Sequence, residues 1–387
     1  QTTLLSSVFA KNTQKNADGR ITNVICNSAK QGLIPQREYF DKDIANSDNT
    51  NGYYIIEEND FVYNPRKSAD APYGPISSYK YTEAGIVSPL YLCFRAKKEI
   101  NPAFFEWYFQ SPAWHRYVYM SGDSGARHDR VSIKDDIFFA MPICLPSAHE
   151  QERIASFLER VDQRIEKQRA LVDALKKYKR GLLSREFGQQ ENGDLNNRHV
   201  GKLKDYFHLS SGSTPSSTNR AFYSGNIRWV SSGELKPKYL CETSQHISSE
   251  AVSSCNLREY PANTLLIAMY GLEAAGVRGT ASILSVPATI SQACMAIQQT
   301  GEIDIEYLYY WYIYNGQWIG IRIAQGTKQQ NLSTDTLGSL RIYAPSYSKQ
   351  KKVCKLLSQI DYLIEKESQK FDLISSVKRG LLQQIFI

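Results

Sequence analysis

Apolar residues recur at alternating steps of three and four along two long stretches of the chain, 146–187 and 345–386. In the first stretch these positions are Ile154, Leu158, Val161, Ile165, Val172, Leu175 and Leu182. This spacing is the 3.5-residue repeat of a coiled-coil seam. No proline follows Pro146 and no glycine precedes Gly181 in this stretch. We therefore expect one uninterrupted helix that begins just after Pro146, with Ser147 as its N-cap.

The second stretch repeats the first without a gap, 199 positions later, so that Pro146 recurs as Pro345. Its seam positions are Val353, Leu357, Ile360, Ile364, Phe371, Ile374 and Leu381. The polar interruptions of the seam also recur, with Gln168 matched by Glu367 and Lys179 matched by Lys378. Polar residues inside a seam cost stability and fix its register or partner. The repeat therefore favours two related seam helices over two unrelated surface helices.

Between these helices the chain has the pattern of short strands separated by turn residues. In the first part, strands are expected at 52–56, 60–63 and 86–94, and a helix is expected to open at Pro102. In the second part, strands are expected at 227–230, 264–269 and 289–297. We therefore divide the chain into a first globular domain at 1–145, a central helix at 146–187, a polar linker at 188–198, a second globular domain at 199–345 and a C-terminal helix at 346–387.

The two globular parts resemble each other, so the whole chain is a tandem repeat. Trp311 and Trp318 keep the seven-residue spacing of Trp107 and Trp114, and apolar neighbours predict that all four are core residues. A tandem repeat of this kind tends to fold with an internal pseudo-twofold axis. The predicted fold class is α+β, with two globular domains in a pseudo-twofold arrangement joined by two long helices that form an antiparallel coiled coil.

Composition and charge narrow the class of protein. The chain has 387 residues, 42% hydrophobic and 22% charged, as expected for a globular protein with two or three domains. Its net charge of +7 is concentrated in the long helices: 147–187 carries ten basic and seven acidic residues, and 346–387 carries eight and four. Local basic surfaces on balanced domains are suited to binding a polyanion.

The cysteines are seven in number and scattered, with no C-x-x-C pair. This pattern predicts a reducing compartment and no zinc site. No apolar run approaches about 20 residues, so we expect no transmembrane helix, and no signal peptide is apparent. Because the chain begins at Gln1 rather than methionine, we expect that residues precede it.

Several short motifs carry a more specific resemblance. The repeated pattern P-S-x-x-x-Q … D-x-x-I-E-K … K-R-G-L-L-x-x-x-F resembles the two conserved regions of Type I restriction–modification specificity subunits. The G-S-T-P sequence at 212–215 and the G-N-I-R-W sequence at 225–229 resemble the opening of a target recognition domain. Residues 291–293 and 326–333 resemble its later motifs. The chain departs from the family at Lys349, where glutamate is common, and its first domain has no clear G-x-T-P opening, which indicates a different subtype.

This resemblance implies a DNA-reading subunit without chemistry of its own. Each globular domain would read one half of a split, asymmetric site in double-stranded DNA, and the antiparallel helices would hold the two readers a fixed distance apart. Two modification subunits would bring S-adenosylmethionine and methylate adenine. Two restriction subunits using ATP and Mg²⁺ would join in complexes that also cleave DNA. The family also implies the cytoplasm of a prokaryote.

Motifs typical of an enzyme are incomplete. Asp70-Ala71-Pro72-Tyr73 is similar to the D-P-P-Y motif of amino-methyltransferases, but the glycine-rich strand–turn–helix that binds S-adenosylmethionine is missing. Glu234-Leu235-Lys236 lacks the P-D that precedes such a tripeptide in nucleases. We find no P-loop, no H-E-x-x-H and no Ser/His/Asp grouping. The sequence therefore predicts no catalytic residues and no metal site.

Base reading requires Arg, Lys, Asn and Gln on loops, and phosphate binding also uses hydroxyls and backbone amides. In the first domain the candidate DNA contacts are Arg20, Asn27, Lys30, Arg66, Lys67, Tyr79, Lys80, Arg127 and Arg130. In the second they are Ser211, Thr214, Arg220, Arg228, Tyr270, Arg278, Lys328, Gln329 and Gln330. The alternative hypothesis is a coiled-coil scaffold whose globular domains bind proteins and have no DNA specificity.

Overall fold

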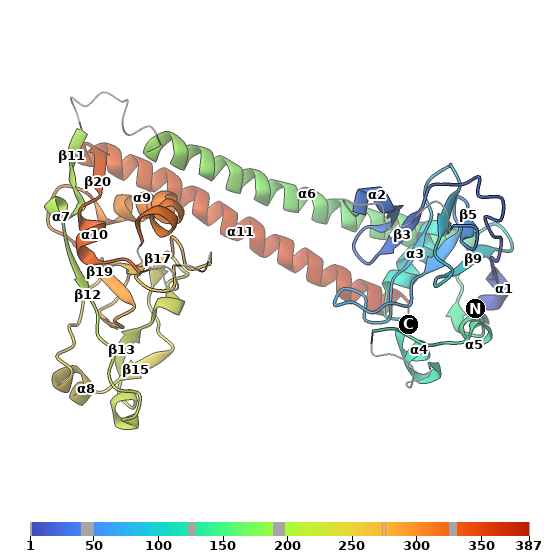
Figure 1. Ribbon diagram of the computed structural model, residues 1–387, viewed down its shortest axis with the longest axis horizontal. Helices are drawn as coiled ribbons and strands as arrows, with labels where there is room; N and C mark the ends of the chain where they lie inside the picture. The colour runs from blue at the N-terminus through green and yellow to red at the C-terminus, as the bar shows by residue number, and fades with distance from the viewer. Residues whose placement is uncertain are drawn as a thin grey trace. The chain divides into compact units, whose positions relative to one another are not determined.

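The computed structural model describes residues 2–39, 50–122, 129–188, 198–272, 274, 276–324 and 331–386. It consists of two compact units, one made of Gln1–Ala170 with Ser368–Ile387 and the other of Leu171–Glu367. Each unit contains one globular domain and a portion of both long helices (Figure 1). The five-part division predicted from the sequence follows secondary structure, whereas these units are defined by packing and cut across both helices.

Both predicted long helices are confirmed. The first, α6, spans Ala148–Phe187, and the second, α11, spans Tyr347–Ile385. Ser147 caps α6 as expected: its hydroxyl accepts a hydrogen bond from the Glu150 amide at 3.4 Å, and the Glu150 carboxylate accepts one from the Ser147 amide at 3.0 Å. This reciprocal arrangement is a capping box, which satisfies amide groups that the helix start leaves unpaired.

The first unit is built from short strands and short helices. Its elements before α6 are β1 (Thr2–Leu4), α1 (Leu5–Val8), β2 (Phe9–Lys11), β3 (Ile25–Ser28), β4 (Gly32–Pro35), α2 (Gln36–Tyr39), β5 (Tyr54–Ile56), β6 (Phe61–Tyr63), β7 (Ile76–Ser78), β8 (Gly85–Val87), β9 (Leu92–Ala96), α3 (Pro102–Gln110), α4 (His115–Ser121), α5 (Asp135–Phe139) and β10 (Pro142–Cys144). The main sheet has the strand order β2-β9-β6-β7, and β1-β10, β3-β4 and β5-β8 are two-stranded.

The second unit has the same plan with a larger sheet. Its elements before α11 are β11 (Arg198–Lys202), α7 (Leu203–Tyr206), β12 (Phe207–Ser211), η3 (Arg220–Tyr223), β13 (Ile227–Val230), η4 (Ser232–Glu234), β14 (Tyr239–Leu240), β15 (Gln245–Ile247), α8 (Ser249–Ser254), β16 (Leu265–Ala268), β17 (Ala281–Leu284), β18 (Thr289–Ile290), β19 (Cys294–Gln299), α9 (Ile305–Trp318), η5 (Ile319–Ile323), α10 (Thr334–Gly338) and β20 (Arg341–Pro345). The five-stranded sheet has the order β12-β19-β16-β17-β14, beside β15-β13-β18 and β11-β20.

Strand pairing confirms the tandem repeat and the α+β class. In each unit the first strand pairs antiparallel with the last one before the long helix, β1 with β10 and β11 with β20. The main sheets then match strand for strand, with β2-β9-β6-β7 corresponding to β12-β19-β16-β17. The second unit adds β14, which pairs parallel to β17 at the edge of the sheet.

Two of the predicted strands are wrong in the same way. The run 86–94 is divided into β8 and β9, and the run 289–297 is divided into β18 and β19. A turn at Ser88–Tyr91 breaks the first run, with the Tyr91 amide donating to the Ser88 carbonyl at 3.0 Å, and the Cys294 amide closes the equivalent turn onto Ser291 at 3.0 Å. The divided strands belong to different sheets, so one apolar run serves two layers.

Three of the four tryptophans are buried as predicted, and one is not. Trp107, Trp114 and Trp311 are at most 6% exposed, whereas Trp318 is 51% exposed. In the first unit α3 ends at Gln110, and the following turn returns Trp114 to the core, where its indole nitrogen donates to the Phe109 carbonyl at 2.9 Å. In the second unit α9 continues without a break to Trp318, so no turn returns this side chain to the core and it stays exposed to solvent.

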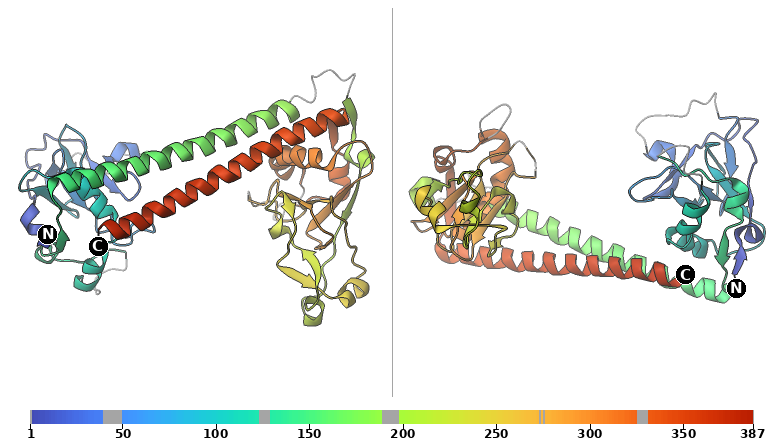
Figure 2. Two further views of the ribbon diagram at one scale, coloured as in Figure 1. Left: turned by 180° about the vertical axis from the view of Figure 1, so that it is seen from behind. Right: turned by 90° about the horizontal axis from the view of Figure 1, so that it is seen from below.

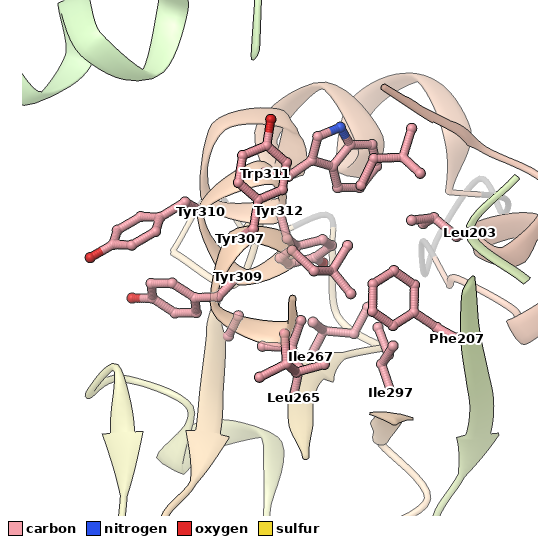
Figure 3. Close-up of a cluster of buried hydrophobic side chains, with 14 of the residues drawn as sticks. Leu203, Phe207, Leu265, Ile267, Ile297, Tyr307, Tyr309, Tyr310, Trp311 and Tyr312 are labelled. Carbon is pink, nitrogen blue, oxygen red and sulfur yellow. The ribbon is translucent and has the colours of Figure 1, made fainter. Parts of the chain in front are cut away.

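The long helices pack against the cores of both units. In the first unit, Leu158 of α6 belongs to the same apolar cluster as Leu382 of α11 and the aromatic side chains of α3. In the second unit, Leu183 of α6 and Leu357 of α11 join the core between the five-stranded sheet and α9, part of which Figure 3 shows. The start of one helix thus meets the end of the other in each unit, which makes them antiparallel there (Figures 1 and 2).

None of the helices in the part of the chain that the structure describes has the length and apolar character needed to cross a membrane.

Candidate nucleic-acid interface

A cleft of about 800 Å³ in the first unit collects several of the predicted contact residues. It lies between the β3-β4 hairpin, the segment after β6 and the short segment around Arg130. Four basic side chains line it, and Asp70 is the acidic residue among its lining residues. The basic residues are Lys30, Arg66, Lys67 and Arg130. The amide and hydroxyl side chains of Gln31, Gln36, Asn64 and Ser68 also line it, so the cleft offers both charges and hydrogen-bonding groups.

Arg66 and Arg130 face each other in this cleft. The two residues form an antiparallel β-bridge, which the Val131 amide secures by donating to the Pro65 carbonyl at 2.9 Å. Residues directly opposite on an antiparallel pair project from the same face, and like charges in such positions destabilise the pair. The buried Nε of Arg130 has no hydrogen-bond partner among the described residues, and the nearest carboxylate, Asp129, lies 3.9 Å away. An anion between the two guanidinium groups would relieve both conditions.

The lysines of the first unit differ in their surroundings. Lys30 is exposed and pairs loosely with Asp70 at 3.4 Å across the mouth of the cleft. Lys80 lies 3.0 Å from Glu106, and Arg20 lies 3.1 Å from Asp18, outside the lining of the cleft. Surface ion pairs of this kind contribute little to stability, so these side chains remain available to an incoming polyanion.

Asn27 and Tyr79 are corrections, because the structure uses both to hold the core together. The Asn27 amide donates to the Val62 carbonyl at 2.7 Å, and its oxygen accepts from Ser77 at 2.9 Å. Tyr79 is fully buried, with its hydroxyl donating to the Glu83 carbonyl at 2.9 Å. Buried polar groups need such partners, and groups satisfied in this way are not free to read bases.

In the second unit the predicted G-S-T-P segment packs tightly against residues 290–294, where the Gly212 amide donates to the Cys294 carbonyl at 3.2 Å. A Cβ on Gly212 would lie 2.3 Å from the Ile290 carbonyl oxygen, so only glycine fits there. The Thr214 hydroxyl accepts a hydrogen bond from the Gln292 amide at 3.2 Å, and the Trp229 indole donates to the Ser213 carbonyl at 3.4 Å. These bonds bring the first and the later family-like motifs together and leave Thr214 exposed beside Gln292.

The other candidates of the second unit separate into exposed residues and structural ones. Ser211 and Arg220 are exposed. The guanidinium groups of Arg228 and Arg278 are half-buried and donate to the carbonyls of Cys241 at 3.1 Å and Leu272 at 2.6 Å, which ties them to neighbouring loops. Tyr270 packs partly buried against the core. The remaining candidates lie outside the described residues: Arg127, Lys328, Gln329 and Gln330.

All fourteen residues of the predicted seam are buried or half-buried on the two long helices. The buried face is wider than the predicted seam, however. Four residues outside the predicted seam positions are also 8% exposed or less: Ala155, Leu183, Cys354 and Leu382. A helix that packs on a globular core as well as on a partner helix needs a broader apolar stripe than a simple coiled coil. The sequence signal for the wider buried face was a second apolar residue directly after a seam residue, as in Leu182-Leu183 and Leu381-Leu382.

Each lysine that interrupts the seam pairs with an aspartate on the other long helix. Lys378 pairs with Asp162 in the first unit, and the repeat-equivalent Lys179 pairs with Asp361 in the second. Each ammonium also lies over an aromatic ring of the globular domain, with Lys378 4.7 Å from the centre of the Trp107 ring. The side chains of both lysines are 19% exposed, so the charges are largely withdrawn from water.

Asp304, Glu306 and Cys354 lie together where α9 meets α11. Lys351 contacts Asp304 at 2.5 Å, and Lys238 contacts Glu306. Burial raises the pKa of the Cys354 thiol, which disfavours the thiolate that a metal would require. The carboxylates of Asp304 and Glu306 are thus each paired with a lysine of the protein itself.

Comparison with known proteins supplies the context for these features. The family model for the Type I restriction modification DNA specificity domain matches residues 9–175 and again 197–375. The specificity subunit of the Type I restriction enzyme MjaIX from Methanocaldococcus jannaschii is 28% identical over 192 residues, 49% of this chain and 43% of that protein. The chain spans under half of the length of the curated relatives it matches.

Solved structures show the same fold. A chain from a study of complex assembly and conformational transition in the type I R-M system is similar with a TM-score of 0.67 and 15% identity, covering 99% of this chain and 96% of that one. The HsdS subunit from Thermoanaerobacter tengcongensis gives a TM-score of 0.57 and 15% identity, with 100% and 96% covered. Both repeats, both long helices and the family model agree, and the chain belongs to the family of Type I restriction modification DNA specificity domains.

Proposed function

We propose that this protein is the DNA specificity subunit of a Type I restriction–modification complex and that each unit binds one half of a split site in double-stranded DNA. The observation that carries the proposal is the basic cleft of the first unit, which is lined by Lys30, Lys67 and the facing arginines and by a single carboxylate, Asp70. Arginine and lysine bind phosphates as cations and bind guanine through O6 and N7, whereas Gln and Asn bind adenine. Lysine, arginine and glutamine side chains line this cleft. Asn64 also lines it, but its side chain is hydrogen-bonded to backbone groups.

The second unit would bind its half-site through the surface around Thr214 and Gln292. Exposed hydroxyls and amides of this kind position DNA phosphates and contact base edges. The close packing at Gly212 supports this part of the proposal, because together with the Gln292–Thr214 hydrogen bond it fixes Thr214 beside a second loop. A rigidly held contact residue loses less entropy on binding than a mobile one.

In this proposal the chemistry belongs to partner subunits, and the chain itself is not an enzyme. Two modification subunits would carry S-adenosylmethionine and methylate adenine. Complexes that also cleave DNA would add two restriction subunits that use ATP and Mg²⁺. The complex would work in the cytoplasm of a prokaryote, where its DNA substrate lies.

Salt dependence and site selection test the proposal together. A DNA-reading protein should lose affinity steeply with added salt, with a slope of about −0.9 in log affinity per phosphate contact. Selection from random duplexes by the purified full-length chain should return two short fixed sequences separated by a fixed gap. A flat salt response with no selected sequence would instead favour the protein-binding scaffold. Titration calorimetry with S-adenosylmethionine should show no binding to the chain alone.

A further inference from the structure

One half-buried lysine ties the edge of the second unit's sheet to its helices. Lys238 precedes the edge strand β14, and its ammonium donates three hydrogen bonds: to the Glu306 carboxylate, to the Tyr310 hydroxyl at 2.9 Å and to the Ser358 hydroxyl at 2.5 Å. Glu306 and Tyr310 lie on α9, and Ser358 lies on α11. An ammonium has three protons to donate, so its hydrogen-bonding capacity is fully used.

Aromatic rings enclose this ammonium. Its nitrogen lies 4.6 Å from the centre of the Tyr310 ring, 5.0 Å from that of Tyr239 and 5.7 Å from that of Tyr309, and the side chain is only 14% exposed. The hydroxyl ends of Tyr309 and Tyr310 point away from the apolar cluster below them (Figure 3). Because water has little access, removing the ammonium would leave the Glu306 carboxylate without its charge partner.

The network continues from Lys238 to both long helices. The Tyr310 hydroxyl donates to the Asp361 carboxylate of α11 at 2.8 Å, and Asp361 is the ion-pair partner of Lys179 on α6. Ser358 donates to Glu306 at 2.7 Å. One set of hydrogen bonds and ion pairs within the second unit therefore connects the edge of the five-stranded sheet, α9 and the two long helices. Such a network fixes relative orientation in a way that apolar packing does not, because each bond has a required direction.

In the first unit the sheet also bonds to the equivalent helix, where the Ser78 hydroxyl of β7 donates to the Glu106 carboxylate of α3 at 2.6 Å, but the residue that would continue the network to the long helices differs. Phe104 packs on Phe386 there as Tyr307 packs on Phe187 in the second unit, which aligns Trp107 with Tyr310. A tryptophan at this place has no hydroxyl to link the seam to the sheet. The nearest counterpart of Lys238 is Lys80, which pairs with Glu106 at 3.0 Å but is 70% exposed.

We propose that Lys238 is a positioning residue that sets how strictly the protein measures the gap between its two half-sites; the inference rests on the proposed function. A tilt of about 10° at the base of a domain moves a point about 20 Å away by roughly 3.5 Å, close to the rise of one base pair. A sheet held on the helices by directional bonds resists that tilt. A sheet held by apolar contacts alone tolerates it, and with it a gap one base pair shorter or longer.

The test measures gap preference separately from base preference. Wild-type protein first selects its site from random duplexes. Affinity is then measured for duplexes with the selected gap and with gaps one base pair shorter and longer. K238M should reduce the discrimination between these gaps at least fivefold while the selected half-site sequences stay the same, and K238R should restore much of the discrimination. K236M, which removes an exposed lysine two residues away, should behave as wild type.

The outcomes are separable. Unchanged gap discrimination in folded K238M would overturn the inference and leave the proposed function standing. If K238M does not fold, Y310F decides the same question, because it keeps the ring and removes the hydroxyl that reaches Asp361. Wild-type discrimination in Y310F would then overturn the inference. A wild-type chain that selects no split site would overturn the proposed function itself and the inference with it.

Discussion

Lys378 of α11 forms an ion pair with Asp162 of α6 within the seam of the first unit. The same pair occurs with exchanged helices in the second unit, where Lys179 of α6 meets Asp361 of α11. From Asp162 to Lys179 the chain advances 17 residues along α6, and from Lys378 to Asp361 it goes back 17 residues along α11. Equal steps in opposite directions are what an antiparallel pair of helices requires. A one-residue slip of either helix would place both lysines against the wrong side chains, so the two pairs specify register.

Reversing one of these charges should destabilise the protein, and exchanging both should restore it. K378D places two carboxylates opposite each other and should lower the free energy of unfolding by about 1–3 kcal/mol, because both groups are only partly exposed. The double variant D162K/K378D should recover most of that loss in urea denaturation. R379D changes an exposed neighbour by the same charge and should cost less than about 0.5 kcal/mol. Equal losses in K378D and the double variant would contradict the pairing.

Phenylalanines on two faces of α6 should respond very differently to truncation. Phe187 is 3% exposed and packs on Tyr307 with a ring-centre distance of 5.1 Å, whereas Phe157 is 42% exposed. F187A should lower the free energy of unfolding by about 3–5 kcal/mol through lost burial and a residual cavity. F157A should change it by less than about 0.5 kcal/mol. Thermal or urea unfolding of the two variants checks the prediction, and similar losses would contradict the assigned faces.

The facing arginines should account for part of the salt dependence of DNA binding. If each contacts one phosphate, R66Q/R130Q should reduce the slope of log affinity against log salt by about 1.8, with weaker binding to all sequences. Fluorescence anisotropy across a salt series measures this slope. The control R20Q removes an exposed arginine outside the cleft and should leave the slope nearly unchanged. A larger change in R20Q than in R66Q/R130Q would place the DNA elsewhere.

The second unit should lose stability in acid through Glu306. Burial raises the pKa of this carboxyl, but hydrogen bonds from Lys238 and Ser358 and the charge of Lys238 outweigh that effect and lower it below its ordinary value. A carboxyl with a lowered folded-state pKa contributes stability that is fully present above its unfolded value of about 4.3 and is lost as pH falls through the folded value.

Unfolding measured between pH 3 and 7 should therefore show a shallower acid limb in E306Q than in the wild type. E259Q, at an exposed position, serves as the matched control. An acid limb of wild-type steepness in E306Q would show that other carboxylates determine the acid sensitivity.

Much of the framework follows from local patterns in the sequence. The apolar positions recur every 3.5 residues, so the helix positions and their buried faces were predictable from local spacing. The whole pattern recurs after 199 positions, so the tandem order was predictable from self-similarity. The division of the apolar runs at 86–94 and 289–297 between two sheets was not, because an apolar run does not reveal which layer each half joins. Trp318 shows the same limit, since its exposure depends on where α9 ends rather than on its spacing.

The candidate site was predictable only in its residue types. The sequence pointed to Lys30, Arg66 and Arg130 but equally to Asn27 and Tyr79, which the structure uses as core residues. Loop residues have no periodicity, so their exposure depends on contacts with distant parts of the chain. Lys238 gave no local signal at all, because its partners lie 68 to 120 residues away.

The sequence by itself thus determined the two helices, their register residues and the repeated order of elements, because each depends on periodicity or on self-similarity. Only the tertiary structure decided which polar side chains are satisfied inside the protein and which face the cleft, because hydrogen bonding and burial are set by long-range packing.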